Sequence, residues 1–395
     1  MGSSVTTKVI RSIPEIDEIR ERWIAWQRHP ESDLNYFLSR FQFRPEFRRP
    51  HIIVASRDEH PEAILVGRYE ELKIRDFKIG PWRILQPRGR LLSFNYSGLL
   101  GEPTTESCQA IVQSIRSCMR NGEADLATLN NVRTDSPFYA AINDARGVRT
   151  PSDKDSIFEH HSMKLPNTVE EAFKGLSGHH RHKVRNQAKR FLAAYNNQLR
   201  VDEFRHPDSI DRMMQEVDLV ARKTYQSGMG VGFMNTPEIR HRLLMFSQND
   251  QIRVYVLYAA DQPCAFWIGT LYRGIYHVNW IGFDPAYGEH SPGIFLFTKI
   301  LERLCAEGVS EVDFDYGSEN YKQRFGNVHW QEALVYFFAS STKGLELRLL
   351  RKQSFLTDKY IRVGLERINL LPKIKRFWRK RLAESSASRA NKPVK

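Results

Sequence analysis

The sequence predicts a mixed α/β (α+β) protein in which two similar units follow one another along the chain. The chain has 395 residues, of which 41% are aliphatic or aromatic, and this suffices for two hydrophobic cores. β-rich runs alternate with segments of helical periodicity, and one order of elements occurs twice, about 200 residues apart. We expect each unit to be a twisted mixed sheet flanked by helices. The expected divisions are residues 1–165, residues 166–340, and a basic helical extension with a disordered tail at 341–395.

The first copy of the repeated order starts with two strands joined by a short polar turn. Further strand-like runs, a helix and a last strand follow. The expected elements are 52–56, 62–67, 82–85, 91–94, 105–121 and 125–129. In the helix, Ile111, Ile115 and Met119 recur every four residues and therefore lie on one face, which predicts that this face packs on the sheet.

The second copy repeats this order. Its expected elements are 253–258, 265–269, 275–281, 292–307 and 309–314. Its helix places Ile294, Phe297 and Leu301 on one face and stops at Gly308. Between the copies we expect helices over 169–198, 209–225 and 238–246. The chain is again helical from Ser340 to Leu370.

Cysteine usage and hydropathy favour a cytoplasmic protein. None of the four cysteines (Cys108, Cys118, Cys264 and Cys305) belongs to a close pair, so a disulfide framework is not expected. The first 30 residues are charged and have no apolar core of the kind that secretory signals contain. No apolar run is long enough to span a bilayer.

Most of the formal charge of +13 lies at the C-terminal end. Residues 373–395 contain nine Lys or Arg and one acid, Glu384, so they contribute 9 − 1 = +8. Such a tail can attract an anionic membrane surface or tRNA, and it can equally serve only to keep the protein in solution. We expect no specific DNA binding.

A loop at 283–293 joins an expected strand to an expected helix. Gly288 lies in this loop, Ser291 is placed as the helix N-cap, and Gly293 removes side-chain bulk from the first turn. The unpaired N–H groups and the positive dipole end of a helix suit a pyrophosphate. The alternative is a well-capped helix with no ligand.

A second segment, 313–326, begins at the end of a strand and reads Asp-Phe-Asp-Tyr-Gly-Ser-Glu-Asn-Tyr-Lys-Gln-Arg-Phe-Gly. Ligand clefts of open α/β sheets tend to lie at such ends. Asp315, Glu319 and Tyr321 offer groups for proton transfer, and Lys322 offers a contact for an anion. A solvated loop with a charge pair would explain the same residues.

The order of elements, the Ser-Pro-Gly helix start and the segment at 313–326 resemble one branch of the GNAT-fold acyltransferases. This branch contains FemAB-type transferases and the acetyltransferases of cellulose and exopolysaccharide biosynthesis. The resemblance covers roughly residues 40–340 and implies tandem GNAT-like units, of which the second keeps the working cleft. Lys322 falls on the lysine that recurs in the branch. The Arg/Gln-x-x-Gly-x-Gly/Ala loop of the wider superfamily is not reproduced at 288–293.

A basic helix at 178–190 places Arg181, Arg185 and Lys189 on one face. Relatives in this branch have a basic helix beside the acceptor cleft, which implies a contact with a phosphate or a polysaccharide precursor. A solvated face is the alternative. The spacing of the histidines in this helix matches no common zinc pattern, and we expect no metal. We interpret His160 and His161 as part of a linker.

The resemblance implies an N-acyltransferase that uses acetyl-CoA or a longer acyl-CoA. The acceptor would be an amine of a sugar, a nucleotide-sugar or another small molecule in polysaccharide or cell-envelope synthesis. Backbone N–H groups near Trp280 and Ile281 would polarise the thioester carbonyl, while Asp315, Glu319 or Tyr321 would take the proton of the amine. One alternative is an aminoacyl-tRNA-dependent transferase that acts on a peptidoglycan precursor. Another is a catalytically silent GNAT scaffold within a polysaccharide-synthesis assembly.

Overall fold

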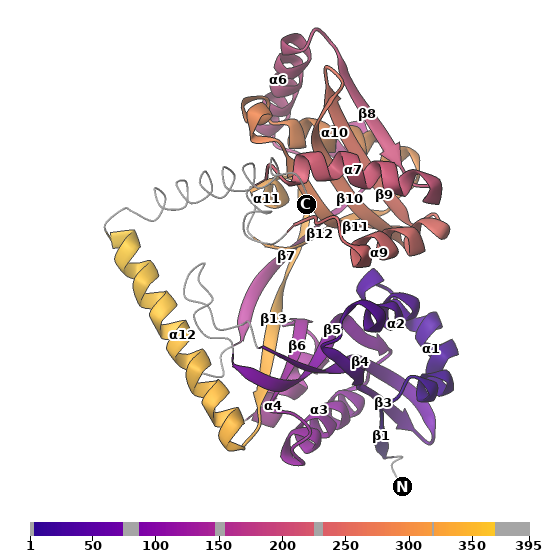
Figure 1. Ribbon diagram of the computed structural model, residues 1–395, viewed down its shortest axis with the longest axis vertical. Coiled ribbons are helices and arrows are strands. Elements are labelled where there is room, and N and C mark those ends of the chain that lie inside the picture. The colour runs from indigo at the N-terminus through magenta and orange to yellow at the C-terminus, as the bar shows by residue number, and fades with distance from the viewer. Residues whose placement is uncertain (1–3, 74–86, 147–154, 225–231, 318–319, 368–395) are drawn as a thin grey trace, which may run out of the picture. The chain divides into compact units, whose positions relative to one another are not determined.

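The computed structural model describes residues 4–73, 87–146, 155–224, 232–317 and 320–367 (Figure 1). It confirms the predicted mixed α/β fold and divides the chain into two compact units. Within the described residues, the N-terminal unit contains 4–159 and 330–367, and the C-terminal unit contains 160–329. The expected boundaries at 165 and 340 differ from this division, chiefly because residues 330–340 belong to the N-terminal unit.

The N-terminal unit is built on a mixed sheet in which the strands follow the order β1-β3-β4-β5-β6-β13, with β2 paired to β4. All neighbouring pairs for which a register is given are antiparallel, except the parallel pair β5–β6. The strands are β1 (Val5–Ile10), β2 (Phe47–Pro50), β3 (Ile52–Arg57), β4 (His60–Lys73), β5 (Arg88–Gly101), β6 (Leu126–Arg133) and β13 (Val328–Phe338). The expected run at 82–85 lies outside the described residues.

Helices cover both faces of this sheet. Ile53 and Ala55 of β3 pack with α3 (Thr105–Arg120) and α4 (Pro137–Arg146). The alternate residues Ile52 and Val54 pack with the helices on the opposite face, because side chains along a strand point to opposite sides in turn. These helices are η1 (Pro14–Ile19), α1 (Arg20–Trp26), η2 (Pro30–Ser32) and α2 (Leu34–Phe43).

The C-terminal end of the described chain belongs to the N-terminal unit through β13 and α12 (Thr342–Arg367, yellow in Figure 1). Ala333 and Val335 of β13 join the core beneath α3, and Leu347 of α12 packs with Leu91 and Tyr336. Pairing of β13 with β6 links segments about 200 residues apart, so the period of the sequence could not reveal it.

The C-terminal unit has its own mixed sheet, in which the order is β12-β11-β10-β9-β8 and residues 160–164 of β7 (Ser156–Lys164) pair antiparallel with β12. The pair β11–β12 is parallel, whereas β10–β11, β9–β10 and β8–β9 are antiparallel. The strands are β8 (Leu199–Phe204), β9 (Ile252–Ala259), β10 (Gln262–Tyr272), β11 (Ile275–Phe283) and β12 (Glu311–Tyr316).

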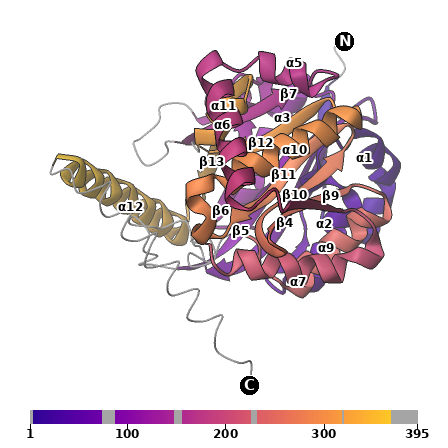
Figure 2. The same ribbon diagram turned by 90° about the horizontal axis from the view of Figure 1, so that it is seen from above.

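This second sheet is also covered on both faces (Figure 2). Tyr255 and Leu257 of β9 pack with the buried residues of α5 (Val169–Lys174), α6 (Gly178–Ala194) and α10 (Pro292–Ala306). The opposite face contacts α7 (Ile210–Ala221) and α9 (Pro237–Gln248). The helical segment expected over 169–198 consists of two helices, α5 and α6, because the chain breaks at 175–177, where Ser177 caps α6. The short helices η4 (Pro207–Ser209), η5 (Pro285–His290) and α11 (Asn320–Phe325) complete the unit.

The predicted repeat is present in the structure. The N-terminal unit runs β3-β4-β5-α3-β6 and the C-terminal unit runs β9-β10-β11-α10-β12. In both units the last two strands form the parallel pair that the intervening helix requires. All four cysteines are buried free thiols. None of the described helices is long and apolar enough to cross a membrane.

Candidate active site

The parallel strands β11 and β12 separate soon after they meet. Their paired residues run only from Ile275 opposite Glu311 to His277 opposite Asp313, although β11 continues to Phe283. A bulge beside β10 removes Asn279 from the ladder on the other side of β11, and the side-chain Oδ1 of Asn279 accepts a hydrogen bond from Thr270 Oγ1 at 2.7 Å. The divergence leaves a cleft whose wall exposes unpaired backbone of β11.

A cavity of about 570 Å³ opens in this cleft, which is a typical volume for a small-molecule site. It lies between the separated parts of β11 and β12 and reaches the first turn of α10. Its lining consists of Gly232, Trp267, Val278, Asn279, Trp280, Ile281, Gly282, Phe283, Gly288, Ser291, Gly293, Ile294, Phe314, Asp315, Tyr321 and Lys322. Most of these groups are apolar, and the polar groups gather where β12 ends and where α10 begins.

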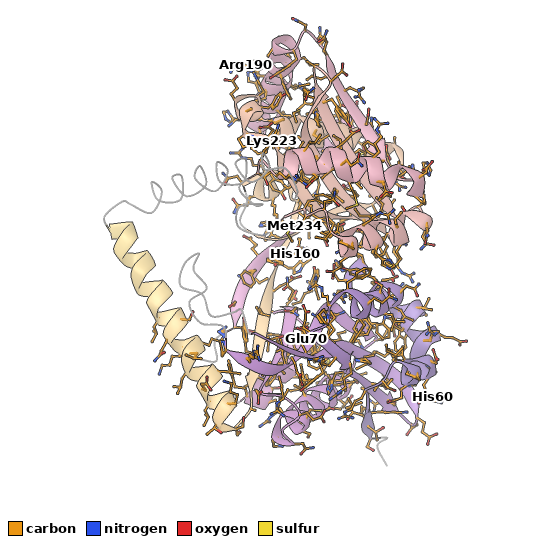
Figure 3. The ribbon with its side chains drawn as sticks, viewed as in Figure 1. His60, Glu70, His160, Arg190, Lys223 and Met234 are labelled. Atoms are coloured by element: carbon orange, nitrogen blue, oxygen red, sulfur yellow. The ribbon has the colours of Figure 1, made fainter. Side chains whose placement is uncertain are left out.

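The loop before α10 is held by ionic and backbone contacts. Asp284 is buried, and its Oδ1 accepts the N–H of Ala286 at 3.0 Å, which starts η5. Its Oδ2 accepts a hydrogen bond from Lys223 Nζ at 2.7 Å (Figure 3 labels Lys223). These contacts fix the approach of the chain to the first turn of α10.

The N-terminus of α10 faces the cavity without a side-chain cap. Ser291 occupies the predicted N-cap position with a left-handed φ of 53°, but its side chain makes no capping hydrogen bond. Instead, Ser291 Oγ accepts a hydrogen bond from Gln187 Nε2 of α6 at 2.9 Å. A Cβ atom added to Gly293 would meet no heavy atom within 4 Å, so the first turn borders open space. This arrangement suits an anionic group of a ligand.

The equivalent position in the N-terminal unit is filled by the protein's own side chains. Thr104 and Ser107 form a reciprocal capping box at the start of α3, and Glu62 accepts a hydrogen bond from Ser107 Oγ at 2.6 Å. Where β5 and β6 diverge, Asn130 Nδ2 donates to the Phe94 carbonyl at 2.6 Å and bridges the two strands. This comparison within one chain favours the C-terminal unit as the one that accepts a ligand.

Asp315 brings a titratable group to the cavity at the end of β12. Burial raises its pKa from 3.8 to about 6; the N–H of Tyr316, 2.8 Å from Oδ1, opposes this rise. The negative charge of Asp313 raises the pKa further, whereas His160 and Lys322 lower it. A carboxyl group with this pKa is largely ionised at neutral pH and can still accept a proton effectively.

Two more of the predicted residues line the same cavity as Asp315. Lys322 is buried, and its Nζ donates to the Tyr316 carbonyl at 2.6 Å and to the Asp315 carbonyl at 3.5 Å. The ring of Tyr321 stands edge-on to the rings of Trp267 and Phe314, with centroids 5.7 Å and 5.8 Å away. Glu319 lies outside the described residues.

The predicted basic face of α6 does not line the cavity. Arg181 Nη1 donates to the Lys174 carbonyl at 2.9 Å and thereby caps the end of α5. Arg185 and Lys189 are exposed. Their contact with an acceptor stays a prediction, while Arg181 has a clear structural role.

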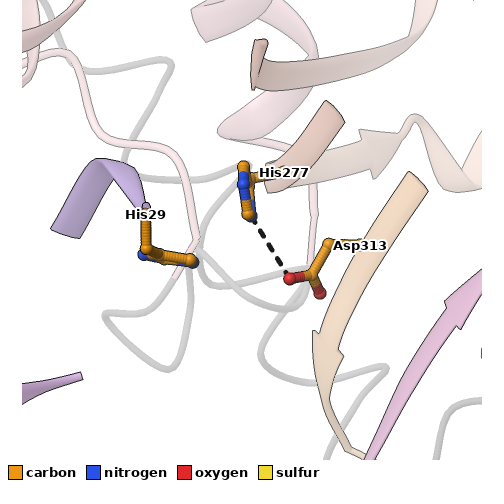
Figure 4. Close-up of side chains that lie close together, drawn as sticks. All are labelled: His29, His277 and Asp313. Carbon is orange, nitrogen blue, oxygen red and sulfur yellow. Dashed lines mark ion pairs between the residues drawn. The ribbon is translucent and has the colours of Figure 1, made fainter. Parts of the chain in front are cut away.

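One buried cluster was missed by the sequence interpretation. His160 lies in β7 with no exposed surface, so the linker interpretation is wrong (Figure 3). His160 Nε2 hydrogen-bonds Asp313 Oδ1 at 2.6 Å, and His277 Nδ1 forms an ion pair with Asp313 Oδ2 at 3.2 Å (Figure 4). Burial on its own would raise the pKa of Asp313, but the contacts with His160 and His277 outweigh burial and lower it. No local sequence signal joins these residues.

Comparison with known proteins agrees with this geometry. A family model described as an acetyltransferase (GNAT) domain matches residues 178–323. FemX is 9% identical in sequence, with a TM-score of 0.53 over 87% of this chain and 99% of the FemX chain. L-PGS from Bacillus licheniformis is 11% identical, with a TM-score of 0.50 over 89% of this chain and 99% of the L-PGS chain. No curated protein matches the sequence.

The matched region contains every residue that lines the cavity, from Gly232 through β11 and α10 to Lys322. The two solved structures, at such low identity, support the fold alone. Because the family match and the cleft coincide, an enzyme is favoured over a catalytically silent scaffold. The C-terminal unit therefore has a GNAT-like fold, and its residues 178–323 match an acetyltransferase (GNAT) domain, which supports an acyltransferase.

Proposed function

We propose that the protein transfers the acyl group of acetyl-CoA or a longer acyl-CoA to an amine. The observation that supports this most is the cavity between the diverging β11 and β12, which continues to the uncapped first turn of α10. The pyrophosphate of CoA would lie against Ser291 and Gly293, near Gly288. The thioester would then lie beside the unpaired backbone of β11.

Residues 280–281 of β11 would supply the electrostatic part of the reaction. β12 no longer pairs with β11 at this point. Trp280 and Ile281 therefore line the cavity on the side where β12 would otherwise pair. A backbone N–H directed at the thioester oxygen would stabilise the negative charge that develops there as the amine attacks.

Asp315 is the proposed base. The ionised carboxylate takes a proton from the attacking amine, the nitrogen forms a bond to the carbonyl carbon, and the C–S bond breaks. The CoA thiolate that leaves takes up a proton, for which the nearby Tyr321 hydroxyl is our candidate donor. Lys322 would add positive charge to the cavity and would hold the turn of Asp315 and Tyr316 through its contact with the Tyr316 carbonyl.

The acceptor class follows from the resemblance of the sequence to polysaccharide-related acetyltransferases. We propose an amine of a sugar, a nucleotide-sugar or another small molecule in polysaccharide or cell-envelope synthesis. The exposed Arg185 and Lys189 would contact its phosphate or anionic groups. We further propose that the basic segment at 373–395 attaches this cytoplasmic enzyme to an anionic membrane surface.

Titration calorimetry with CoA and acetyl-CoA tests the donor. We expect the wild-type protein to bind both and Gly293→Asp to bind at least ~10-fold more weakly, because a carboxylate would face the pyrophosphate. Gly178→Asp is the matched control, since it adds the same charge to the first turn of α6, outside the cavity. Failure of the wild-type protein to bind CoA, together with salt-sensitive binding of aminoacyl-tRNA, would replace the donor by aminoacyl-tRNA.

A further inference from the structure

Three buried side chains from three strands meet at the apex of the cleft. His160 belongs to β7, His277 to β11 and Asp313 to β12, and all three are buried. His277 and Asp313 form the last pair of the β11–β12 ladder. The cluster therefore lies at the point where these two strands begin to separate.

Asp313 uses both carboxylate oxygens in this cluster. Its Oδ1 accepts hydrogen bonds from His160 Nε2 at 2.6 Å and from the backbone N–H of Asp315 at 2.8 Å. Its Oδ2 pairs with His277 Nδ1 at 3.2 Å (Figure 4). One carboxylate thus joins two neighbouring strands to the turn that contributes the proposed base.

The turn at Asp315 needs such support. Asp315 has a left-handed φ of 64°, a conformation that is unfavourable for a residue with a Cβ. The bond from its own N–H to Asp313 Oδ1 closes an Asx turn and offsets this cost. At the other end of the turn, Lys322 Nζ holds the Tyr316 carbonyl.

We infer that Asp313, held between His160 and His277, is a positioning residue that fixes the Asp315 turn at the cavity and governs how readily Asp315 takes up a proton. The inference deepens the proposed function, because it rests on Asp315 as the base. A merely structural ion pair would contribute to stability and would leave the titration of Asp315 unchanged.

The charges near Asp315 predict whether each substitution raises or lowers its pKa. Besides the N–H of Tyr316, the groups with a resolved influence are Asp313, which disfavours the anion, and His160 and Lys322, which favour it. The influence of Asp313 exceeds that of His160. Removing the charge of Asp313 should therefore ease ionisation of Asp315, and removing His160 should hinder it.

Infrared difference spectroscopy of the full-length protein measures this titration without any substrate. The C=O stretch of a protonated carboxyl group is followed against pH, and the band that disappears in Asp315→Asn belongs to Asp315. We expect its midpoint near pH 6 in the wild type. Asp313→Asn, which keeps an oxygen to accept the Asp315 N–H, should lower the midpoint by about 1 pH unit, and His160→Gln should raise it.

Asp125→Asn is the matched control, because Asp125 is a buried, ion-paired aspartate of the N-terminal unit. It should leave the midpoint unchanged. Equal midpoints in the wild type, Asp313→Asn and His160→Gln would overturn the inference, as would the absence of a band that Asp315→Asn removes. If one variant fails to fold, the other still gives the sign of its own shift. A different result would affect only the proposed function. If Asp315→Asn still transfers the acyl group, Asp315 is not the base, but the measured influence of Asp313 and His160 on its titration still holds.

Discussion

At the scale of single residues, the chemistry depends on how burial and neighbouring charges set proton affinities. Asp313 and Asp315 are two residues apart, yet contacts with His160 and His277 keep the pKa of the first low while burial raises the pKa of the second. Their environments thus separate two like groups into a permanent anion and a proton acceptor.

The proposed base predicts the pH dependence of acyl transfer. Because Asp315 must be ionised and its pKa is about 6, kcat/KM should rise with pH through this value and then level off. Asp315→Asn should lower kcat by about 10²–10⁴-fold and abolish this limb. The check is release of CoA from acetyl-CoA across a panel of amine acceptors. A limb that persists in Asp315→Asn belongs to another group and contradicts the assignment.

Lys322 should matter through the turn that it holds. Lys322→Met removes the bond from Nζ to the Tyr316 carbonyl and keeps the length of the side chain. We expect kcat to fall by at least ~10-fold, because Asp315 would no longer be held in the position from which it takes the proton of the amine. Lys299→Met is the control, since Lys299 pairs with Glu302 on the surface of α10. Equal kcat values in the two variants would speak against a role for Lys322.

At the scale of elements, hydrophobic periodicity predicted the individual helices but could not predict strand pairing between segments far apart in the sequence. The helices at 105–120 and 292–306 were predicted from apolar residues on one face, and both have the expected bounds to within one residue. The strand at 328–338 could not be placed, because its partner is far away in the sequence. The same limit explains the site: Asp315, Tyr321 and Lys322 share one short segment, whereas His160 and Asp313 are 153 residues apart.

A partly buried ionic cluster joins β9 to the C-terminal end of α10 and predicts a measurable effect on stability. The guanidinium of Arg253 is almost fully buried and contacts Glu307 and Asp250, with Nε 3.0 Å from both carboxylate oxygens of Glu307. Glu307→Gln should destabilise the unit by about 1–3 kcal/mol, because the buried Arg253 guanidinium loses one charged partner and keeps Asp250. Glu302→Gln, which removes an exposed pair with Lys299, should cost less than about 1 kcal/mol. Urea unfolding measures both, and equal costs would refute the argument.

At the scale of the whole molecule, one architecture occurs twice, and the cavity between β11 and β12 belongs to the C-terminal copy. The N-terminal copy bridges its strands with Asn130 and caps α3 with Thr104 and Ser107, whereas the C-terminal copy leaves both places free for a ligand. The sequence revealed the repeat through hydrophobic patterning. It did not reveal which side chains bridge β5 to β6 and cap α3 in the N-terminal unit, because such polar contacts follow no period.

Acid should destabilise the N-terminal unit through His51. This side chain has no exposed surface, and burial lowers its pKa from 6.5 to about 4. Between about pH 6.5 and pH 4, His51 is protonated in the unfolded chain and neutral in the folded unit. The free energy of unfolding therefore falls as the pH drops through this range, by up to about 3 kcal/mol. Denaturation of the wild type and of His51→Leu across this range tests the effect. A pH slope that His51→Leu leaves unreduced would assign the sensitivity elsewhere.

The most direct test of the account is a crystal structure of the protein with CoA. We predict that the sulfur lies between β11 and β12 beside Trp280 and Ile281, and that the pyrophosphate contacts the first turn of α10 at Gly293. CoA bound in the N-terminal unit, or bound away from the cavity that these elements line, would contradict the claim that the C-terminal cleft is the active site.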